Sequence, residues 1–177
     1  MSCCKIASPD VLVPLETERF IIRRFQPKDL SSFLEFMLDD ESTKYLAFGD
    51  EQKTDDGAKA LFDFVCSSYE SESPIHSYVI AEEDRYVGSC GFAPYDEGIY
   101  ECYYCVNKTE CGKGVATEVT KAIAQVLSET LEVRAYCHPE NYAAHAVAKK
   151  AGFIHNGLNL HKNFRTESEL FIYKRDS

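Results

Sequence analysis

A short glycine-containing segment between a β-rich stretch and a long amphipathic helix constrains the fold of this chain most. It reads Cys111-Gly112-Lys113-Gly114-Val115-Ala116-Thr117. Two glycines and a small alanine let a ligand approach the backbone closely, and the first N–H groups of a helix bind phosphate oxygens. The segment therefore predicts a cradle for a pyrophosphate group, although two glycines at a helix start can also make only a tight turn.

Spacing distinguishes this segment from two other phosphate loops. A Walker A loop requires Ser or Thr after its lysine, but Gly114 follows Lys113. A dinucleotide fingerprint requires a third glycine where Thr117 stands, together with a parallel strand-helix-strand unit. The strands before the segment are expected to be antiparallel, so both ATP-dependent phosphotransfer and dinucleotide binding are disfavoured.

Short β-rich runs and amphipathic helices alternate along the rest of the chain. Strands are expected at about residues 20–22, 77–83, 85–93, 99–106, 133–137, 153–158 and 170–174, and helices at about 27–37, 55–68, 113–129 and 141–151. The pattern predicts one α/β (α+β) domain over residues 15–177, with a mixed, mostly antiparallel sheet of about seven strands and helices on both faces. Residues 1–14, which include Pro9 and Pro14, are expected to form a tail or lead-in.

Charge and hydropathy limit the expected partners. The chain carries 29 Asp and Glu residues against 19 Lys and Arg residues, a balance that repels nucleic acid and favours cationic substrates such as amines. No stretch approaches the roughly 20 apolar residues that cross a bilayer, and no signal peptide is recognisable, so we expect a cytoplasmic protein without a membrane partner. The eight cysteines are then expected to be reduced. Cys102 and Cys105 lie three apart in a strand, point to opposite faces and are not expected to share a metal ion.

Several segments, taken in order, resemble the GNAT superfamily of N-acetyltransferases, and within it the ribosomal-protein-alanine acetyltransferase (Rim-like) branch. The segments are Thr17–Arg23, Tyr86–Gly88 with Gly91-Phe92, Gly112–Glu118, and Asn141 with Lys150–Phe153. The resemblance extends from about Glu16 to Tyr173. Each motif alone is moderately specific, but all of them in order are strongly so.

The resemblance implies a sheet that splays open between its fourth and fifth strands, with the pantetheine arm of acetyl-CoA in the gap. The arm would pair with one strand, the glycine segment would hold the pyrophosphate, and Asn141 would lie beside the thioester. The residues expected to bind acetyl-CoA are Tyr104, Cys105, Val106, Cys111, Gly112, Lys113, Gly114, Val115, Ala116, Thr117, Asn141 and Ala144. The resemblance implies no metal, and it is compatible with a monomer or a homodimer.

Two departures from the family pattern concern chemistry. Cys111 stands where the loop usually begins with Gln, Arg or an aromatic residue, and it is either a reactive thiol or a small neutral space-filler. Relatives carry a Ser or a Tyr that is thought to protonate the departing thiolate, but this chain has Ala144 and Ala148 at those places. Tyr103, Tyr142 and His145 are possible substitutes.

Two residues are candidates for the general base that takes a proton from the amine. Glu101 lies on the strand beside the implied splay, and His138 follows the strand at residues 133–137. The leading hypothesis is an acetyl-CoA-dependent N-acetyltransferase acting on a protein N-terminal α-amine or a small-molecule amine. The alternative is a catalytically weak or inactive acyl-CoA-binding module. Residues 27–72 and 158–168 are expected to determine the acceptor.

Overall fold

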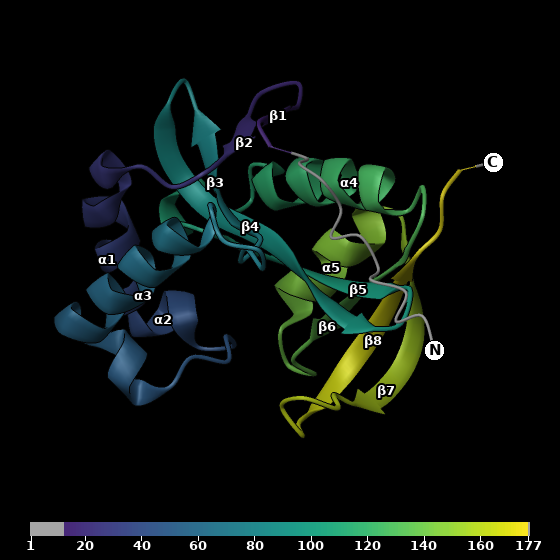
Figure 1. Cartoon of the computed structure of the whole chain (residues 1–177). Helices are drawn as coiled ribbons and strands as arrows, with labels where there is room; N and C mark the ends of the chain where they lie inside the picture. Colours follow the sequence, from purple (N-terminus) through teal and green to yellow (C-terminus); the bar gives the residue numbers. More distant parts are fainter. Residues whose placement is uncertain (1–12, 177) are drawn as a thin grey trace, which may run out of the picture.

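A single twisted sheet runs through the computed structural model, which describes residues 13–176 (Figure 1). Its eight strands are β1 (Leu15–Glu16), β2 (Ile21–Arg23), β3 (Ser77–Glu82), β4 (Arg85–Asp96), β5 (Ile99–Val106), β6 (Glu132–Cys137), β7 (Phe153–Leu160) and β8 (Glu167–Tyr173). They are ordered β1-β2-β3-β4-β5-β6-β8-β7, and every neighbouring pair is antiparallel except β5 with β6. The mixed, mostly antiparallel sheet is confirmed. The expected count of seven omitted β1, because two residues are too few to show a periodic pattern.

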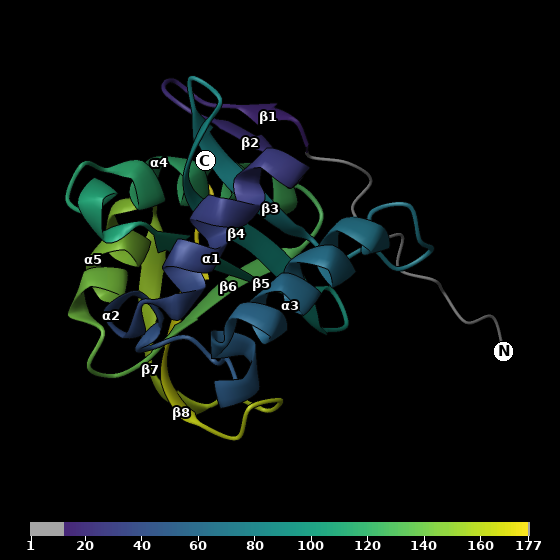
Figure 2. The ribbon, with the colours of Figure 1, turned by 90° about the vertical axis from the view of Figure 1, so that its left-hand side faces the viewer.

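Within residues 13–176, five α-helices cover the sheet. They are α1 (Leu30–Leu38), α2 (Asp40–Thr43), α3 (Asp55–Ser68), α4 (Val115–Leu127) and α5 (Tyr142–Lys150), with single 3-10 turns at Pro27–Asp29, Asp50–Lys53 and Lys108–Glu110. Helices α1 to α3 lie on one side of the sheet, and α4 and α5 lie on the other, as both Figure 1 and Figure 2 show. The predicted arrangement of helices on both faces is therefore confirmed.

Local sequence explains where the helices begin. Thr54 caps α3 by accepting the N–H of Gly57 through its hydroxyl at 3.1 Å, which satisfies one of the free donors of the first turn. Helix α4 begins at Val115 and not at Lys113, because Gly114 has a left-handed backbone with φ of +78°. From that start, Val115, Val119, Ile123 and Leu127 recur every fourth residue and are all buried.

Aromatic packing joins the helices α1 and α3 to the sheet. The ring of Phe25 meets the rings of Phe33 on α1 and Phe62 on α3 edge to face, both at 5.5 Å between centroids. Tyr86 on β4 lies 6.3 Å from the same Phe25 ring. This cluster sets the position of the α1–α3 side of the molecule relative to the sheet.

The two parallel strands in the middle of the sheet part soon after they meet. Only Ile99 to Glu101 on β5 pair with Glu132 to Arg134 on β6, and the remaining residues of β5 have no partner on β6. This is the implied splay. It was expected between the fourth and fifth strands. These are β5 and β6 in the structure, because the unexpected strand β1 is counted first.

The predicted tail at residues 1–14 is described only at its end. Residues 1–12 lie outside the described part of the chain, and Val13 is buried at 8% exposure. The domain boundary at residue 15 stays a prediction. No helix within residues 13–176 is long and apolar enough to cross a bilayer.

Candidate active site

The glycine segment forms the turn between β5 and α4. Gly112 and Gly114 both have φ of +78°, a conformation that glycine adopts at little cost. The first hydrogen bond of the helix runs from the Glu118 N–H to the Gly114 carbonyl at 3.1 Å. The N–H groups of residues 115–117 precede it and have no acceptor within the helix. These groups, at the positive end of the helix dipole, are available to an anion.

A basic side chain from the start of the chain is fixed beside this turn. Arg19 donates from Nη1 to the Lys113 carbonyl at 2.9 Å and from Nε to the Glu118 carboxylate at 2.8 Å. The hydroxyl of Thr17 donates to the same carboxylate at 2.7 Å. Burial opposes ionisation, but the hydrogen bonds from Thr17 and Arg19 leave the pKa of Glu118 below its usual value. A methyl group placed on Gly114 would lie 3.3 Å from Arg19 Nη2, so the guanidinium borders the turn directly.

A second basic side chain is held at the same turn. Glu110 is buried at 7% exposure and pairs with Arg85 at 2.7 Å and Lys113 at 3.1 Å. Hydrogen bonds from Arg85 and Lys113 lower the pKa of the Glu110 carboxyl. The ammonium of Lys113 is therefore anchored near the free N–H groups of α4.

One tyrosine bridges the gap where β5 and β6 part. The phenol of Tyr104 donates to the Ala144 carbonyl on α5 at 2.9 Å, and its oxygen lies 3.9 Å from Cys137 Sγ at the end of β6. The N–H of Ala144 is bonded in turn to Asn141 Oδ1 at 3.2 Å, which caps α5. Burial raises the pKa of Tyr104, so the phenol keeps its proton and the bridge persists at alkaline pH.

Burial keeps both cysteines of the C-x-x-C in the neutral thiol form. Cys102 is buried at 6% exposure, and burial raises its pKa. Burial also raises the pKa of Cys105 to about 12, so this thiol stays neutral at the gap. Among residues 13–176 there is no group of three His, Cys, Asp or Glu side chains placed to hold a metal ion.

Glu101 lies at the point where the two parallel strands separate. It is the last residue of β5 that pairs with β6, opposite Arg134. Its carboxylate oxygen Oε2 lies 2.6 Å from Nε2 of His161, a residue in the connection between β7 and β8. The Glu101 side chain is 19% exposed and that of His161 is 2% exposed. The pair thus combines a partly open carboxylate with a buried partner.

The protonation of the His161 ring follows from its other contacts. Its Nδ1 accepts the backbone N–H groups of Asn163 at 3.3 Å and Phe164 at 3.2 Å. Because Nδ1 accepts, Nε2 carries the proton and donates it to the Glu101 carboxylate. Tyr136 packs edge to face on the imidazole with centroids 4.7 Å apart. His161 therefore holds the Glu101 carboxylate in one orientation.

His138 has a different environment. It is exposed, and its ring packs against Tyr45 with centroids 4.9 Å apart. Its Nδ1 accepts the N–H of Glu140 at 3.1 Å, so in the neutral ring the proton lies on Nε2 and neither nitrogen is a free acceptor. This arrangement disfavours His138 as a general base.

Both candidate bases line one large cavity of about 610 Å³. The cavity lies between helices α1 and α3, with the connection at residues 44–48, and strands β5, β6 and β8, and most of its wall is aromatic or aliphatic. The lining residues used below are Lys44, Phe64, Glu101, Tyr103, His138, His161, Phe164 and Glu167. Residues two apart on a strand share a face, which explains why Glu101, Tyr103 and Cys105 all line it.

The structure brings the predicted residues together in two groups. Cys111 to Thr117 form the turn at the start of α4, and Glu101, Cys105 and His138 line the cavity. Tyr104, Asn141 and Ala144 connect the two sides of the splay, whereas Cys111 is exposed and does not line the cavity. Ala144 and Ala148 provide no hydroxyl. Arg19 and His161 were not predicted, because only the tertiary structure places them at the turn and at Glu101.

A protein-family model for the acetyltransferase (GNAT) domain matches residues 19–154. The chain belongs to the GNAT acetyltransferase family. The predicted superfamily, the acyltransferase activity and acetyl-CoA as co-substrate follow from that membership, and no metal is part of it.

Relatives agree with the GNAT assignment. An uncharacterized N-acetyltransferase of Bacillus subtilis (strain 168), YnaD, is 29% identical over 148 residues, which are 81% of this chain and 84% of the relative. The solved structure of RimL, a ribosomal L7/L12 α-N-protein acetyltransferase in complex with coenzyme A, is similar with a TM-score of 0.70 and 12% identity, over 88% of this chain and 94% of RimL. AAC(6')-Ib, solved with ribostamycin and coenzyme A, reaches a TM-score of 0.71 and 16% identity, over 89% and 94%. Both structures have the GNAT fold, and RimL represents the Rim-type branch. The two proteins differ in the acceptor that they acetylate.

Proposed function

We propose that this enzyme transfers the acetyl group of acetyl-CoA to a primary amine that enters the cavity, with Glu101 as the general base. The observation that carries the proposal is the Glu101 carboxylate, which faces the cavity at the divergence of β5 and β6 and is oriented by His161. His138 is the weaker candidate because both of its ring nitrogens are engaged or protonated.

Binding of the co-substrate is assigned to the turn before α4 and to the edge of β5. The N–H groups of residues 112–117, with Arg19 and Lys113 beside them, provide donors and positive charge for a pyrophosphate. From Val106 to Glu101, β5 runs back about 17 Å at roughly 3.3 Å per residue. An extended arm along this unpaired edge would bring a thioester from the turn to Glu101.

The proposed chemistry has two proton transfers. The Glu101 carboxylate takes a proton from the ammonium, directly or through water, and the free amine attacks the thioester carbonyl. The C–N bond forms, the C–S bond breaks, and the nitrogen loses its second proton while the departing coenzyme A thiolate gains one, through solvent or a nearby donor. None of the three substitutes is favoured as that donor. Tyr103 lines the cavity, but its hydroxyl lies against Gly91 on β4, away from the gap toward β6. Tyr142 is 74% exposed outside the lining, and His145 donates to the His138 carbonyl.

The proposal is tested by coenzyme A thiol release with saturating acetyl-CoA and a panel of primary amines. Release that depends on both substrates, with an acetylated amine identified by mass, supports it. A thermal shift with acetyl-CoA but no release with any amine would favour the alternative, a module that binds the co-substrate without turnover. That alternative rests on Ala144 and Ala148, which lack the hydroxyl of the usual acid.

A further inference from the structure

The chemistry of the cavity wall limits which amines it can take. Along the part of the chain that the structure describes, three formally charged side chains line it: Lys44, Glu101 and Glu167. Lys44 and Glu167 are exposed and lie at the rim, whereas Glu101 is mostly buried. The interior thus offers one carboxylate to one ammonium group. Any further ammonium taken into this space would be desolvated without a partner, which is costly.

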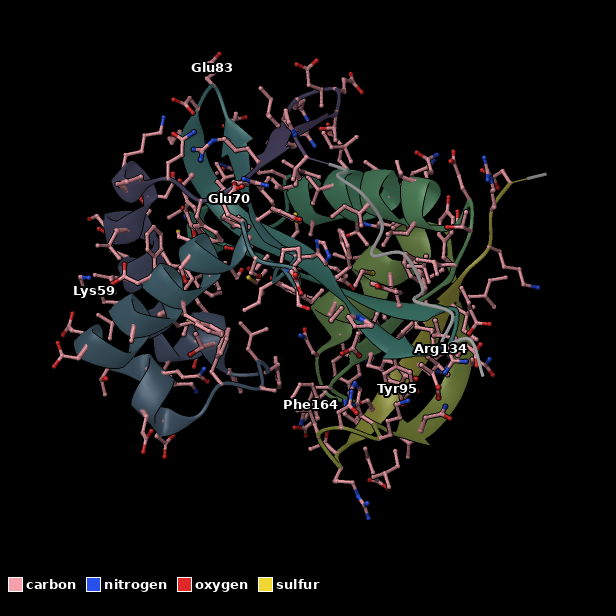
Figure 3. All side chains as sticks on the ribbon, in the orientation of Figure 1. Lys59, Glu70, Glu83, Tyr95, Arg134 and Phe164 are labelled. Carbon is pink, nitrogen blue, oxygen red and sulfur yellow. The ribbon has the colours of Figure 1, made fainter. Side chains whose placement is uncertain are left out.

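Aromatic side chains stand exposed at the opening of the same cavity. Phe64 on α3 is 63% exposed, and Phe164 in the β7–β8 connection is 55% exposed, although both line the cavity. Figure 3 shows Phe164 between the helical side of the molecule and the sheet. Exposed aromatic groups that border a cavity from both sides are characteristic of a site that covers an apolar ligand.

We infer that the acceptor is a small monoamine with an apolar, ring-bearing body. This inference rests on the proposed function of the same site. The ammonium pairs with Glu101 beside the splay, and the apolar body extends along the wall toward Phe64 and Phe164. The volume of about 610 Å³ is within the range of pockets that enclose drug-sized ligands.

The same features disfavour other acceptors. A polyamine or an aminoglycoside carries several ammonium groups, which this wall would leave largely unpaired. Seven lining residues carry a hydroxyl, but the Ser89 hydroxyl is already bonded to the Tyr86 phenol at 2.8 Å and the Tyr136 hydroxyl to Arg134 at 3.0 Å. Discrimination of this type is strong, because a buried polar group without a partner costs more than a lost apolar contact.

The test compares kcat/KM for acceptors at saturating acetyl-CoA. Phenylbutylamine, with its ring at the far end of the chain, is paired with butylamine, whose amine is nearly equally basic. We expect the ring to raise kcat/KM about 10- to 100-fold. Spermidine, kanamycin and a short peptide with a free N-terminal Ser should all be poorer acceptors than phenylbutylamine.

A variant at the rim locates the effect. Phe64→Ser should lower kcat/KM for phenylbutylamine about 10-fold while leaving butylamine and the acetyl-CoA KM unchanged. Ile154→Ser is the matched control, because Ile154 is 50% exposed on β7 and does not line the cavity. This variant should leave kcat/KM unchanged for both phenylbutylamine and butylamine.

The outcomes separate this inference from the proposed function. If spermidine, kanamycin or the peptide is the best acceptor, or if phenylbutylamine is no better than butylamine, the acceptor class is wrong while the acetyltransferase proposal stands. If no amine gives thiol release, the proposed function fails and this inference fails with it.

Discussion

Replacing Glu101 by Gln tests the general base with the least structural disturbance. The amide is nearly the same size as the carboxylate, and its oxygen can still accept the Nε2–H of His161, which is 2.6 Å from Oε2 in the native pair. The variant should therefore fold normally and bind acetyl-CoA with unchanged KM, since the co-substrate is assigned to backbone groups of the turn before α4 and of the β5 edge, which the substitution leaves in place. Only the ability to take a proton is removed.

The size of the effect follows from the role. General base catalysis contributes about 100- to 10,000-fold, so kcat at neutral pH should fall by that factor, which corresponds to roughly 2.7 to 5.5 kcal/mol in the activation free energy. The wild-type rate should rise from neutral to alkaline pH as the acceptor loses its own proton. Glu101→Gln should recover toward the wild-type rate at high pH, where the free amine requires no base.

The assay is the initial rate of thiol release across neutral to alkaline pH, with saturating acetyl-CoA and the best acceptor found. His138→Gln is the matched control and should keep a rate within a few fold of wild type, because the Nδ1 of His138 already accepts the Glu140 N–H. Wild-type turnover by Glu101→Gln at pH 7 would refute the assignment. A large loss in the His138 variant alone would transfer the role to that residue.

Three further predictions concern the co-substrate and the core. At one hundred times its dissociation constant, acetyl-CoA should stabilise the wild type by about 2.7 kcal/mol in a thermal shift assay, and Gly114→Asp should abolish this; Gly98→Asp, at a turn with a similar φ of +68° and open space, should keep it. Arg19→Gln should raise the acetyl-CoA KM about 10-fold by removing a charge-assisted contact at the turn, while Arg24→Gln, at an exposed pair with Glu70, should not; equal KM values in the two variants would contradict the role of Arg19. Leu127→Ala should cost about 2 to 5 kcal/mol of unfolding free energy in urea, because the side chain is 2% exposed on α4; a loss below 1 kcal/mol would mean that this face of α4 is poorly packed.

Local patterns were enough to predict most of the fold. Helix α3 was expected at residues 55–68 and has those bounds, because Thr54 caps its first turn and its apolar residues repeat at helical spacing. The start of α4 was predicted two residues early, since the conformation of Gly114 is set by its tertiary surroundings as well as by its lack of a side chain. Strand β1 has no periodicity to detect in two residues.

The site was only partly accessible to sequence reasoning. Glu101 was identified, but its partner His161 is sixty positions away in a connection without periodic pattern, and only the pairing of β6, β7 and β8 brings them together. Arg19 was within a recognised motif, yet its position at the turn depends on Glu118, ninety-nine positions later. His138 has a residue type that is suitable for a general base. The sequence does not show, however, that its Nδ1 accepts the Glu140 N–H.

The short pairing of β5 with β6 also has a consequence for the dynamics of the unliganded enzyme. Beyond Glu101, the backbone groups of β5 that face β6 have no ladder partner there, although the other edge of the strand is paired with β4 as far as Val106. Amide hydrogens along one strand should therefore exchange with solvent at two very different rates, slowly toward β4 and quickly toward the gap. The middle of the sheet, normally the most protected part of an α/β protein, would contain a row of fast-exchanging amides that acetyl-CoA alone can slow.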